Sequence, residues 1–208
     1  MIEDENQVSW NALAKIYLDK FGGENQYNEW IQSFCSKISA SQPKILDLGC
    51  GPGINAKKIL EYCPDAQLTG IDFAPSMVET AREHVPDAYF QVGDIRNIPR
   101  HLQLFDGIFA SFSIPYINAD DAEKMILECR TRLKRGGVFF LSFIESDENH
   151  SKKVSNSAGL PMTLHYYDAE WIKSILTDLS FDIIDSFQHF EPSYGNDSSR
   201  LCAFISRT

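Results

Sequence analysis

The chain has 208 residues and a formal net charge of −10, from 19 basic and 29 acidic side chains. Hydrophobic residues make up 43% and charged residues 23% of it, an ordinary globular composition that excludes a disordered tail, a collagen-like rod and a coiled coil. At roughly 150 residues per domain, the length predicts one domain over residues 1–208. Because an acidic surface repels phosphate backbones, we expect no generic nucleic-acid binding.

We also expect no membrane anchor and no metal site. The longest apolar run, residues 138–144, is far shorter than the roughly 18 residues that span a bilayer. The start of the chain, residues 1–5, is acidic, whereas a secretory signal begins basic and turns apolar. The five cysteines are scattered and form no C-x-x-C pair, which favours a reducing, cytoplasmic location.

The first 40 residues predict two helices that form an N-terminal cover, separated by Gly22 and Gly23. Apolar residues at helical spacing mark one face of each: Leu13, Ile16 and Tyr17 in the first, and Trp30, Ile31, Phe34, Cys35 and Ile38 in the second.

After residue 43, short apolar runs alternate with amphipathic stretches, which predicts an α/β fold with parallel strands and crossover helices. We expect strands at 44–48, 67–71, 88–92, 107–112 and 138–143, and helices at 55–62, after Pro75 and from Asn118 to just before Gly136. Ser76 and Glu79 have the spacing of a capping box at the start of the second of these helices.

The C-terminal part is less regular. Residues 145–157 are polar and predict a mobile loop. Asp168 is expected to cap a further helix. Two last strands, at 181–187 and 201–206, are too close in sequence for a crossover helix, so we expect antiparallel neighbours at a sheet edge.

The most informative segment is the glycine-rich turn that follows the first strand. Gly49, Gly51 and Gly53 stand between a strand and a helix, where bare backbone lets a ligand approach closely. Open α/β sheets bind nucleotides at this position. A nicotinamide fingerprint would place its third glycine at Ile54, so a nicotinamide cofactor is disfavoured.

Two acids end the next two strands. Asp72 lies about as far beyond the turn as the acid that holds an adenosine ribose in nucleotide-binding folds. Asp94 follows Gly93 at the end of the third strand and could accept a hydrogen bond from the exocyclic amine of adenine. An adenosine ligand is therefore expected.

These motifs resemble the class I S-adenosylmethionine-dependent methyltransferases. The resemblance rests on residues 47–53, 71–77, 93–94, 98–99, 105–106 and 136–137. It implies S-adenosylmethionine as cofactor and a doubly wound, mostly parallel seven-stranded sheet with the last strand antiparallel and helices on both faces. Residues 41–145 would form the cofactor-binding core, between the helical cover at 1–40 and an acceptor-side segment with a C-terminal hairpin at 146–208.

On the methionine side of the cofactor, the resemblance implies roles for five residues. Gly49 and Gly51 would pass under the methionine part, and Asp47 would orient the turn and reach the ammonium group. Ala110 and Ser111, just past the middle of the fourth strand, would lie near the sulfonium.

On the adenosine side it implies five more. Asp72 would hold the ribose hydroxyls, and Phe73 and Met77 would flank the adenine ring. Asp94 and the backbone at Ile95 would read the adenine amine.

The sequence signals for the residues that bind the acceptor are less specific. Family members that methylate base or glutamine amino groups often carry Asn/Asp-Pro-Pro-aromatic after the fourth strand, where this chain has Ser113, Ile114, Pro115 and Tyr116. A small-molecule acceptor is expected, with Tyr116 and His165 as catalytic candidates. His165 would be the base, and Tyr17 would close over the cofactor.

The sequence leaves three functions open: methyl transfer, cofactor binding without turnover, and nicotinamide-dependent oxidation or reduction. The oligomeric state is expected to be a monomer or a homodimer.

Overall fold

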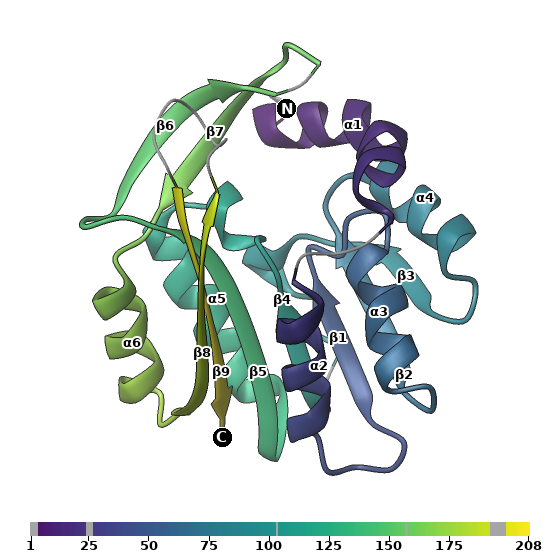
Figure 1. Ribbon diagram of the computed structural model, residues 1–208, viewed down its shortest axis with the longest axis vertical. Coiled ribbons are helices and arrows are strands. Elements are labelled where there is room, and N and C mark those ends of the chain that lie inside the picture. The colour runs from purple at the N-terminus through teal and green to yellow at the C-terminus, as the bar shows by residue number, and fades with distance from the viewer. Residues whose placement is uncertain (1–3, 24–26, 103, 157, 192–198) are drawn as a thin grey trace.

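The computed structural model describes residues 4–23, 27–102, 104–156, 158–191 and 199–208. Within these ranges the chain forms a seven-stranded sheet, a separate two-stranded sheet of β6 and β7, and the helices around them (Figure 1). Residues 1–3, part of the acidic start, lie outside the described residues. The elements, in chain order, are α1 (Glu5–Phe21), α2 (Asn28–Lys37), β1 (Lys44–Leu48), α3 (Ile54–Tyr62), β2 (Gln67–Asp72), α4 (Pro75–His84), β3 (Tyr89–Val92), the 3-10 helix η1 (Ile95–Asn97), β4 (Phe105–Ala110), the 3-10 helix η2 (Ile114–Tyr116), α5 (Ala119–Arg132), β5 (Leu133–Glu145), β6 (His150–Ser155), β7 (Pro161–Tyr166), α6 (Ala169–Asp178), β8 (Asp182–Glu191) and β9 (Ser199–Arg207).

The strand order of the large sheet is β3-β2-β1-β4-β5-β9-β8. The first five strands pair in parallel, and β9 runs antiparallel to both β5 and β8. The predicted fold class, including the antiparallel last strand, is confirmed. The two final strands are antiparallel neighbours at one edge of the sheet, as expected, with β9 inserted between β5 and β8. The order reverses between β1 and β4, which creates a crevice at the carboxyl ends of the strands.

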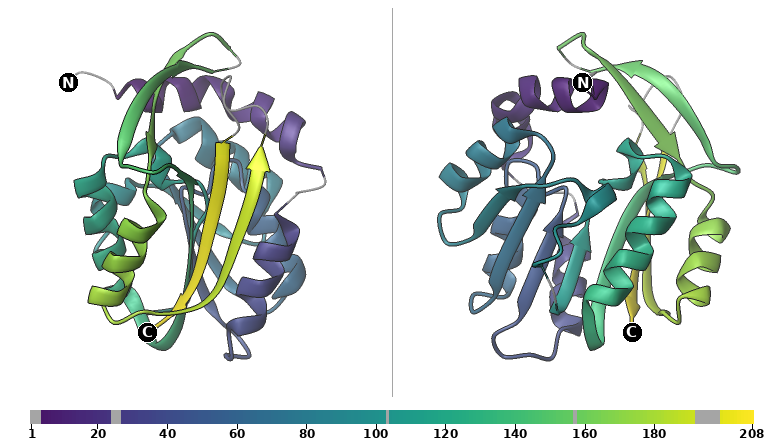
Figure 2. Two further views of the ribbon diagram at one scale, coloured as in Figure 1. Left: turned by 60° about the vertical axis from the view of Figure 1, so that its left-hand side comes forward. Right: turned by 180° about the vertical axis from the view of Figure 1, so that it is seen from behind.

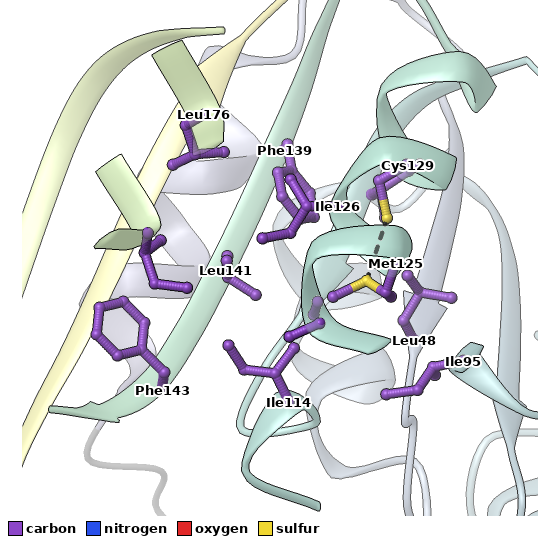
Figure 3. Packing of buried hydrophobic residues seen from close by; sticks show 14 of the residues in the cluster. Leu48, Ile95, Ile114, Met125, Ile126, Cys129, Phe139, Leu141, Phe143 and Leu176 are labelled. Atoms are coloured by element: carbon purple, nitrogen blue, oxygen red, sulfur yellow. Dashed lines mark hydrogen bonds between the residues drawn. The ribbon is translucent and has the colours of Figure 1, made fainter. Parts of the chain in front are cut away.

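Helices bury both faces of the sheet. On one face, α5 and α6 pack Met125, Ile126 and Leu176 against Phe139 and Leu141 of β5, all at most 1% exposed (Figure 3). The opposite face is covered by α2, α3 and α4. Near-complete apolar burial explains why β5 reads as a continuous hydrophobic run in the sequence.

The two N-terminal helices have different positions. Helix α2 packs on a sheet face, where Trp30, Ile31 and Phe34 are buried. Helix α1 instead lies across the end of the sheet beside the β6–β7 hairpin, as two views of the ribbon agree (Figures 1 and 2). Only α1 therefore covers the crevice.

Side chains of α1 join it to the hairpin. The Asn6 amide donates to the carbonyls of Thr163 (3.0 Å) and Tyr116 (3.3 Å) and accepts from the Thr163 N–H (2.9 Å). The Ser9 hydroxyl donates to the Pro161 carbonyl at 2.7 Å. Because Asn6 and Ser9 are buried, these hydrogen bonds fix the position of the hairpin relative to the helix.

The prediction of a polar loop over 145–157 is wrong for residues 150–155, which form β6. This strand is exposed along most of its length and has no apolar alternation that could reveal it. Its six-residue ladder to β7 and the stacking of His150 on Tyr166, with ring centroids 4.7 Å apart, stabilise it instead.

Two of the three predicted helix N-caps are confirmed. Asn118 and Asp168 accept the expected N–H groups, from Asp121 and Glu170 respectively. The capping box of Ser76 and Glu79 is wrong, because Ser76 is already inside α4.

The glycine pair at 136–137 was expected to stop a helix. Helix α5 ends earlier, at Arg132, and β5 begins directly at Leu133. Gly136 has a φ of 75° and lies where the register between β4 and β5 shifts. The two glycines therefore belong to an irregular strand start, which the helix-stop rule does not describe.

Candidate functional site

The glycine-rich turn is tied to the neighbouring strand. The N–H groups of Gly49 and Cys50 donate to the Ile71 carbonyl at 2.9 and 3.0 Å. Gly49 and Gly51 have φ values of 71° and 51°, a region that L-residues rarely occupy. A Cβ on Gly49 would lie 2.7 Å from the Cβ of Ser113, whereas a Cβ on Gly51 would meet nothing within 4 Å. The backbone at Gly51 thus faces open space.

Asp72 holds this turn in place. Its carboxylate accepts hydrogen bonds from the N–H groups of Gly51 and Ala74, both at 2.9 Å. Burial raises the pKa of Asp72 to about 6, although the hydrogen bonds from Ala74 and Gly51 oppose the shift. Each carboxylate oxygen has a second lone pair, so Asp72 can accept further hydroxyl donors.

Asp47 is the most unusual group of the site. It is 1% exposed, and neither of its carboxylate oxygens has a hydrogen-bond partner among the described residues. Burial, together with the negative charge of Asp72, raises the pKa of Asp47 to about 8. Among the described residues no cation pairs with either acid, so a positive charge would be stabilised beside them.

The end of β3 lies beside Asp72, because the Gly93 N–H donates to the Asp72 carbonyl at 2.9 Å. Asp94 caps η1 and pairs with Arg96, whose Nη2 lies 2.7 Å from the Asp94 carboxylate. Arg96 also pairs with Asp4, at the start of α1, at 3.0 Å. Ile95 is buried in the core. Asp72 and Asp94 therefore end neighbouring strands, as the sequence predicted.

Helix α1 closes over the start of α4. Met77 is 2% exposed and packs in one cluster with Leu13 and Ala14 of α1, with Phe73 and Tyr17 half-buried beside them.

Polar contacts join the same two helices. The Asn11 side chain accepts the Ser76 N–H at 3.0 Å and so supplies the cap that the capping box was expected to give. The Gln7 amide donates to the Phe73 carbonyl at 2.6 Å.

The end of β4 has a strained backbone. Phe112 has a φ of 48°, and its N–H donates to the hydroxyl of Ser142 at 2.9 Å. Ala110 is fully buried at the end of the strand, and Ser111 is half-buried. Ser142 therefore supports the backbone beside the predicted methyl-transfer position.

Aromatic rings gather on the expected acceptor side. Trp10 of α1 packs edge-on against both Tyr17 (5.3 Å between centroids) and Tyr116 (5.1 Å). This arrangement brings Tyr116 and Tyr17, which are far apart in sequence, into one aromatic group. A separate group of rings includes Tyr27, which packs against Phe112 at 5.2 Å.

His165 lies on β7 and is half-buried, and that burial lowers the pKa of its imidazole. A neutral imidazole at neutral pH has an acceptor nitrogen, as a base requires. The neighbouring Tyr167 is structural, because its buried hydroxyl lies between the carbonyls of Ile114 and Ile117.

Sequence reasoning missed the supporting residues Asn6, Asn11, Arg96, Ser113 and Ser142. No sequence motif marks them, because tertiary contacts alone give them their positions. In the part of the chain that the structure describes, no three His, Cys, Asp or Glu side chains form a possible metal cluster. Within the same ranges, no helix is long and apolar enough to cross a membrane.

Comparisons with known proteins agree with this geometry. A family described as a methyltransferase domain matches residues 45–137. The chain is 31% identical over 134 residues to a demethylmenaquinone methyltransferase of Thermotoga maritima, covering 64% of this chain and 56% of the relative. It is 27% identical over 176 residues to a trans-aconitate 2-methyltransferase of Variovorax paradoxus, covering 83% of this chain and 65% of that protein. The chain thus spans less than two thirds of either relative.

Over residues 45–137 the chain is therefore similar to a methyltransferase domain.

Solved structures of methyltransferases share its fold. A Burkholderia thailandensis 1,6-didemethyltoxoflavin-N1-methyltransferase, with bound 1,6-didemethyltoxoflavin and S-adenosylhomocysteine, has a TM-score of 0.71 at 15% identity over 98% of this chain and 87% of that chain. A Synechocystis magnesium protoporphyrin IX methyltransferase with bound S-adenosylmethionine has a TM-score of 0.68 at 16% identity, over 100% and 99% of the two chains.

The residues present fit the cofactor of this methyltransferase family. S-Adenosylmethionine carries an ammonium group and a cationic sulfur. The unpartnered carboxylate of Asp47 matches a positive ligand, and the open backbone at Gly51 leaves room for one. Asp72 has free lone pairs at the same edge of the sheet for ribose hydroxyls.

Proposed function

We propose that this chain transfers the methyl group of S-adenosylmethionine to a small-molecule acceptor. The observation that carries the proposal is the buried, unpartnered Asp47 carboxylate beside the open glycine turn, at the carboxyl edge of a methyltransferase sheet. The activities for which the relatives are named, on demethylmenaquinone and trans-aconitate, support a small acceptor. When bound, the cofactor supplies an electrophilic methyl group on a cationic sulfur.

The donor side of the proposal assigns each predicted residue a binding role. On the methionine side, Asp47 pairs with the ammonium group, Gly49 and Gly51 provide bare backbone under the chain, and Ala110 and Ser111 line the sulfonium position. These assignments agree with the burial of Asp47 and Ala110.

On the adenosine side, Asp72 accepts the ribose hydroxyls, and Asp94 with the Ile95 backbone reads the adenine amine. Phe73 and Met77 flank the ring. Both Asp94 oxygens already accept from Arg96, Oδ1 from its backbone N–H and Nε and Oδ2 from Nε and Nη2, so the adenine amine competes with this ion pair for Asp94.

The acceptor would lie between α1, η2 and the hairpin. Trp10, Tyr17 and Tyr116 give this region an aromatic character, which supports an acceptor with a planar ring. The chain's contribution to the reaction is to hold the acceptor in line with the methyl group and to exclude water.

His165 is the proposed base for an acceptor that loses a proton, with Tyr116 as a second catalytic candidate. Replacing His165 by Gln should lower turnover while cofactor affinity stays normal. Unchanged turnover would reject the base role and leave the rest of the proposal in place.

Formation of S-adenosylhomocysteine in the presence of an acceptor panel tests the function. The panel should contain planar phenols, heteroaromatic amines and small carboxylic acids. Product with any acceptor supports methyl transfer, whereas cofactor binding without product across the panel would favour a binding module. Thermal shifts with NAD in parallel test the nicotinamide alternative, which no comparison supports.

The scattered, unpaired cysteines support a reducing, cytoplasmic location. The expected oligomeric state, a monomer or a homodimer, stays a prediction. Light scattering of the purified chain measures it.

A further inference from the structure

Two cysteines that are 28 positions apart in the sequence meet between helices α2 and α3. Cys35 lies in the last turn of α2, and Cys63 follows α3 directly as its C-cap. The two helices pack against each other on one face of the sheet (Figure 1). The Cys35 and Cys63 thiols are in hydrogen-bonding contact, and both are free. Thiols in such contact need only a short approach of the two sulfurs to form a disulfide.

The other three cysteines have different surroundings. Cys50, Cys129 and Cys202 are all at most 3% exposed. Their thiols make polar contacts with groups other than cysteine, namely the Gly51 carbonyl, the Met125 sulfur and the Glu145 carboxylate, respectively. Within the residues that the structure describes, the contact between α2 and α3 therefore holds the one pair of neighbouring thiols.

The two thiols of this pair differ in exposure, which gives them different roles in an oxidation. Cys35 is 7% exposed in the apolar cluster under α2, whereas Cys63 is partly exposed at the end of α3. Burial, together with the neighbouring Cys63, raises the pKa of the Cys35 thiol, so Cys35 keeps its proton and donates it in the hydrogen bond to Cys63. A dissolved oxidant reaches the more exposed sulfur first.

We propose that Cys35 and Cys63 form a redox modification site, at which hydrogen peroxide joins α2 to α3 by a reversible disulfide bond. The Cys63 sulfur first attacks the peroxide: an S–O bond forms, the O–O bond breaks and one water leaves. The Cys35 sulfur then attacks the sulfenic sulfur of Cys63, so that the S–S bond forms, the S–O bond breaks and a second water leaves. Each water takes up one thiol proton. The two sulfurs are oxidised, and the two peroxide oxygens are reduced.

The site is distant from the crevice. Cys35 and Cys63 lie near the ends of their helices, before the starts of β1 and β2, whereas the glycine turn follows the end of β1. The inference is therefore independent of the proposed function. The bond would close a loop between two helices and so restrict the unfolded chain. Reversible disulfides of this kind are compatible with a reducing compartment, where they act in redox sensing.

Peptide mapping of the full chain tests the site, with hydrogen peroxide as the oxidant. Reduced protein is treated with peroxide, alkylated and digested with trypsin in the absence of a reductant. The expected product is the peptide of residues 21–37 joined to that of residues 59–82, with the loss of two hydrogen atoms. Each of these peptides has a single cysteine, so the joined pair identifies the bond. Dithiothreitol should separate the two peptides again.

Three variants sharpen the mapping. Cys63→Ser should abolish the joined pair, because serine cannot form the bond. The matched control is Cys202→Ser, which keeps a donor for Glu145 and should leave the joined pair unchanged. In Cys35→Ala, Cys63 should gain oxygen atoms in place of the bond, because its partner sulfur is missing. If Cys35→Ala folds poorly by circular dichroism, Cys63→Ser at the partly exposed position carries the test.

Thermal melting gives a second readout of the same bond. Because the bond closes a loop, the melting temperature of the peroxide-treated chain should rise by about 5–10 °C, and dithiothreitol should reverse the rise. Peroxide that adds oxygen to Cys63 of the wild type without the joined pair, or that joins other cysteines, would overturn the proposal. A joined chain that melts at a lower temperature would also overturn it, since the thiols would then be badly placed for the bond.

Discussion

The proposed donor side and the proposed acceptor side of the crevice are built in different ways. On the donor side, neighbouring segments at one sheet edge make the contacts: the Gly49 N–H donates to the Ile71 carbonyl, and the Asp72 carboxylate accepts from the N–H groups of Gly51 and Ala74. On the acceptor side, side chains join segments that are distant in sequence, as when Asn6 bonds to Thr163 across 157 positions. The donor half is therefore encoded locally, whereas the acceptor half exists only after tertiary folding.

The largest expected effect comes from the donor turn. Gly49→Ala combines an unfavourable φ with a close contact to Ser113, so unfolding free energy should fall by about 2–5 kcal/mol. Gly51→Ala is the matched control, with an unfavourable φ but no clash, and should lose only about 1–2 kcal/mol. Urea denaturation measures both; equal losses would contradict the close packing of Gly49.

The next largest effect should come from replacing Asp72, the hydrogen-bond acceptor at the end of β2. Asp72→Ala should weaken S-adenosylhomocysteine binding by about 1.5–3 kcal/mol, or roughly 10–150-fold, because a carboxylate that accepts hydroxyl donors is lost. Calorimetry measures the affinity. An unchanged dissociation constant would remove Asp72 from the site.

A change on the acceptor side should spare the donor side. Asn6→Ala leaves the Thr163 N–H and two carbonyls without their partner, which should destabilise the contact of α1 with the hairpin by about 1–3 kcal/mol. Hydrogen exchange at residues 161–166 should become faster while S-adenosylhomocysteine affinity changes less than about threefold. A parallel loss of cofactor affinity would mean that the two halves are not separately built.

The pH dependence of cofactor binding should be smaller and gradual. Burial raises the pKa of Asp47 to about 8 and that of Asp72 to about 6. A cationic ligand needs the ionised forms, so affinity should rise with pH across this window, by at most about tenfold per unit for each titrating group. Titrations at several pH values measure the slope, and Asp47→Asn should flatten its upper part.

The raised pKa values of Asp47 and Asp72 also determine whether the stability of the ligand-free protein rises or falls with pH. Since the folded acids hold their protons above the unfolded pKa of about 4, this contribution to stability is complete below pH about 4. It is lost as pH rises through the folded values near 6 and 8. Thermal melts of the free chain should therefore show this loss, and a stability that rises over the window would contradict the burial of unpartnered acids.

The residues of the proposed donor side could be predicted from the sequence because the signals that mark them are local. The strand, the left-handed glycines and the two strand-end acids each depend on a few consecutive residues, and the structure places them at one edge. Arg96 and Asn11 were missed because their roles arise from contacts with Asp4 of α1 and with Ser76 of α4. The strand β6 was missed for a related reason: an exposed polar strand has no apolar period, and only its pairing with β7 reveals it.

The most direct test of the central claim is a calorimetric titration of the wild-type chain with S-adenosylhomocysteine and, separately, with NAD. Binding of one equivalent of S-adenosylhomocysteine with no heat from NAD is the predicted result, and at a hundredfold excess over its dissociation constant the ligand should stabilise the fold by about 2.7 kcal/mol. Binding of NAD without S-adenosylhomocysteine would contradict the claim that this crevice receives an adenosyl thioether with a cationic tail.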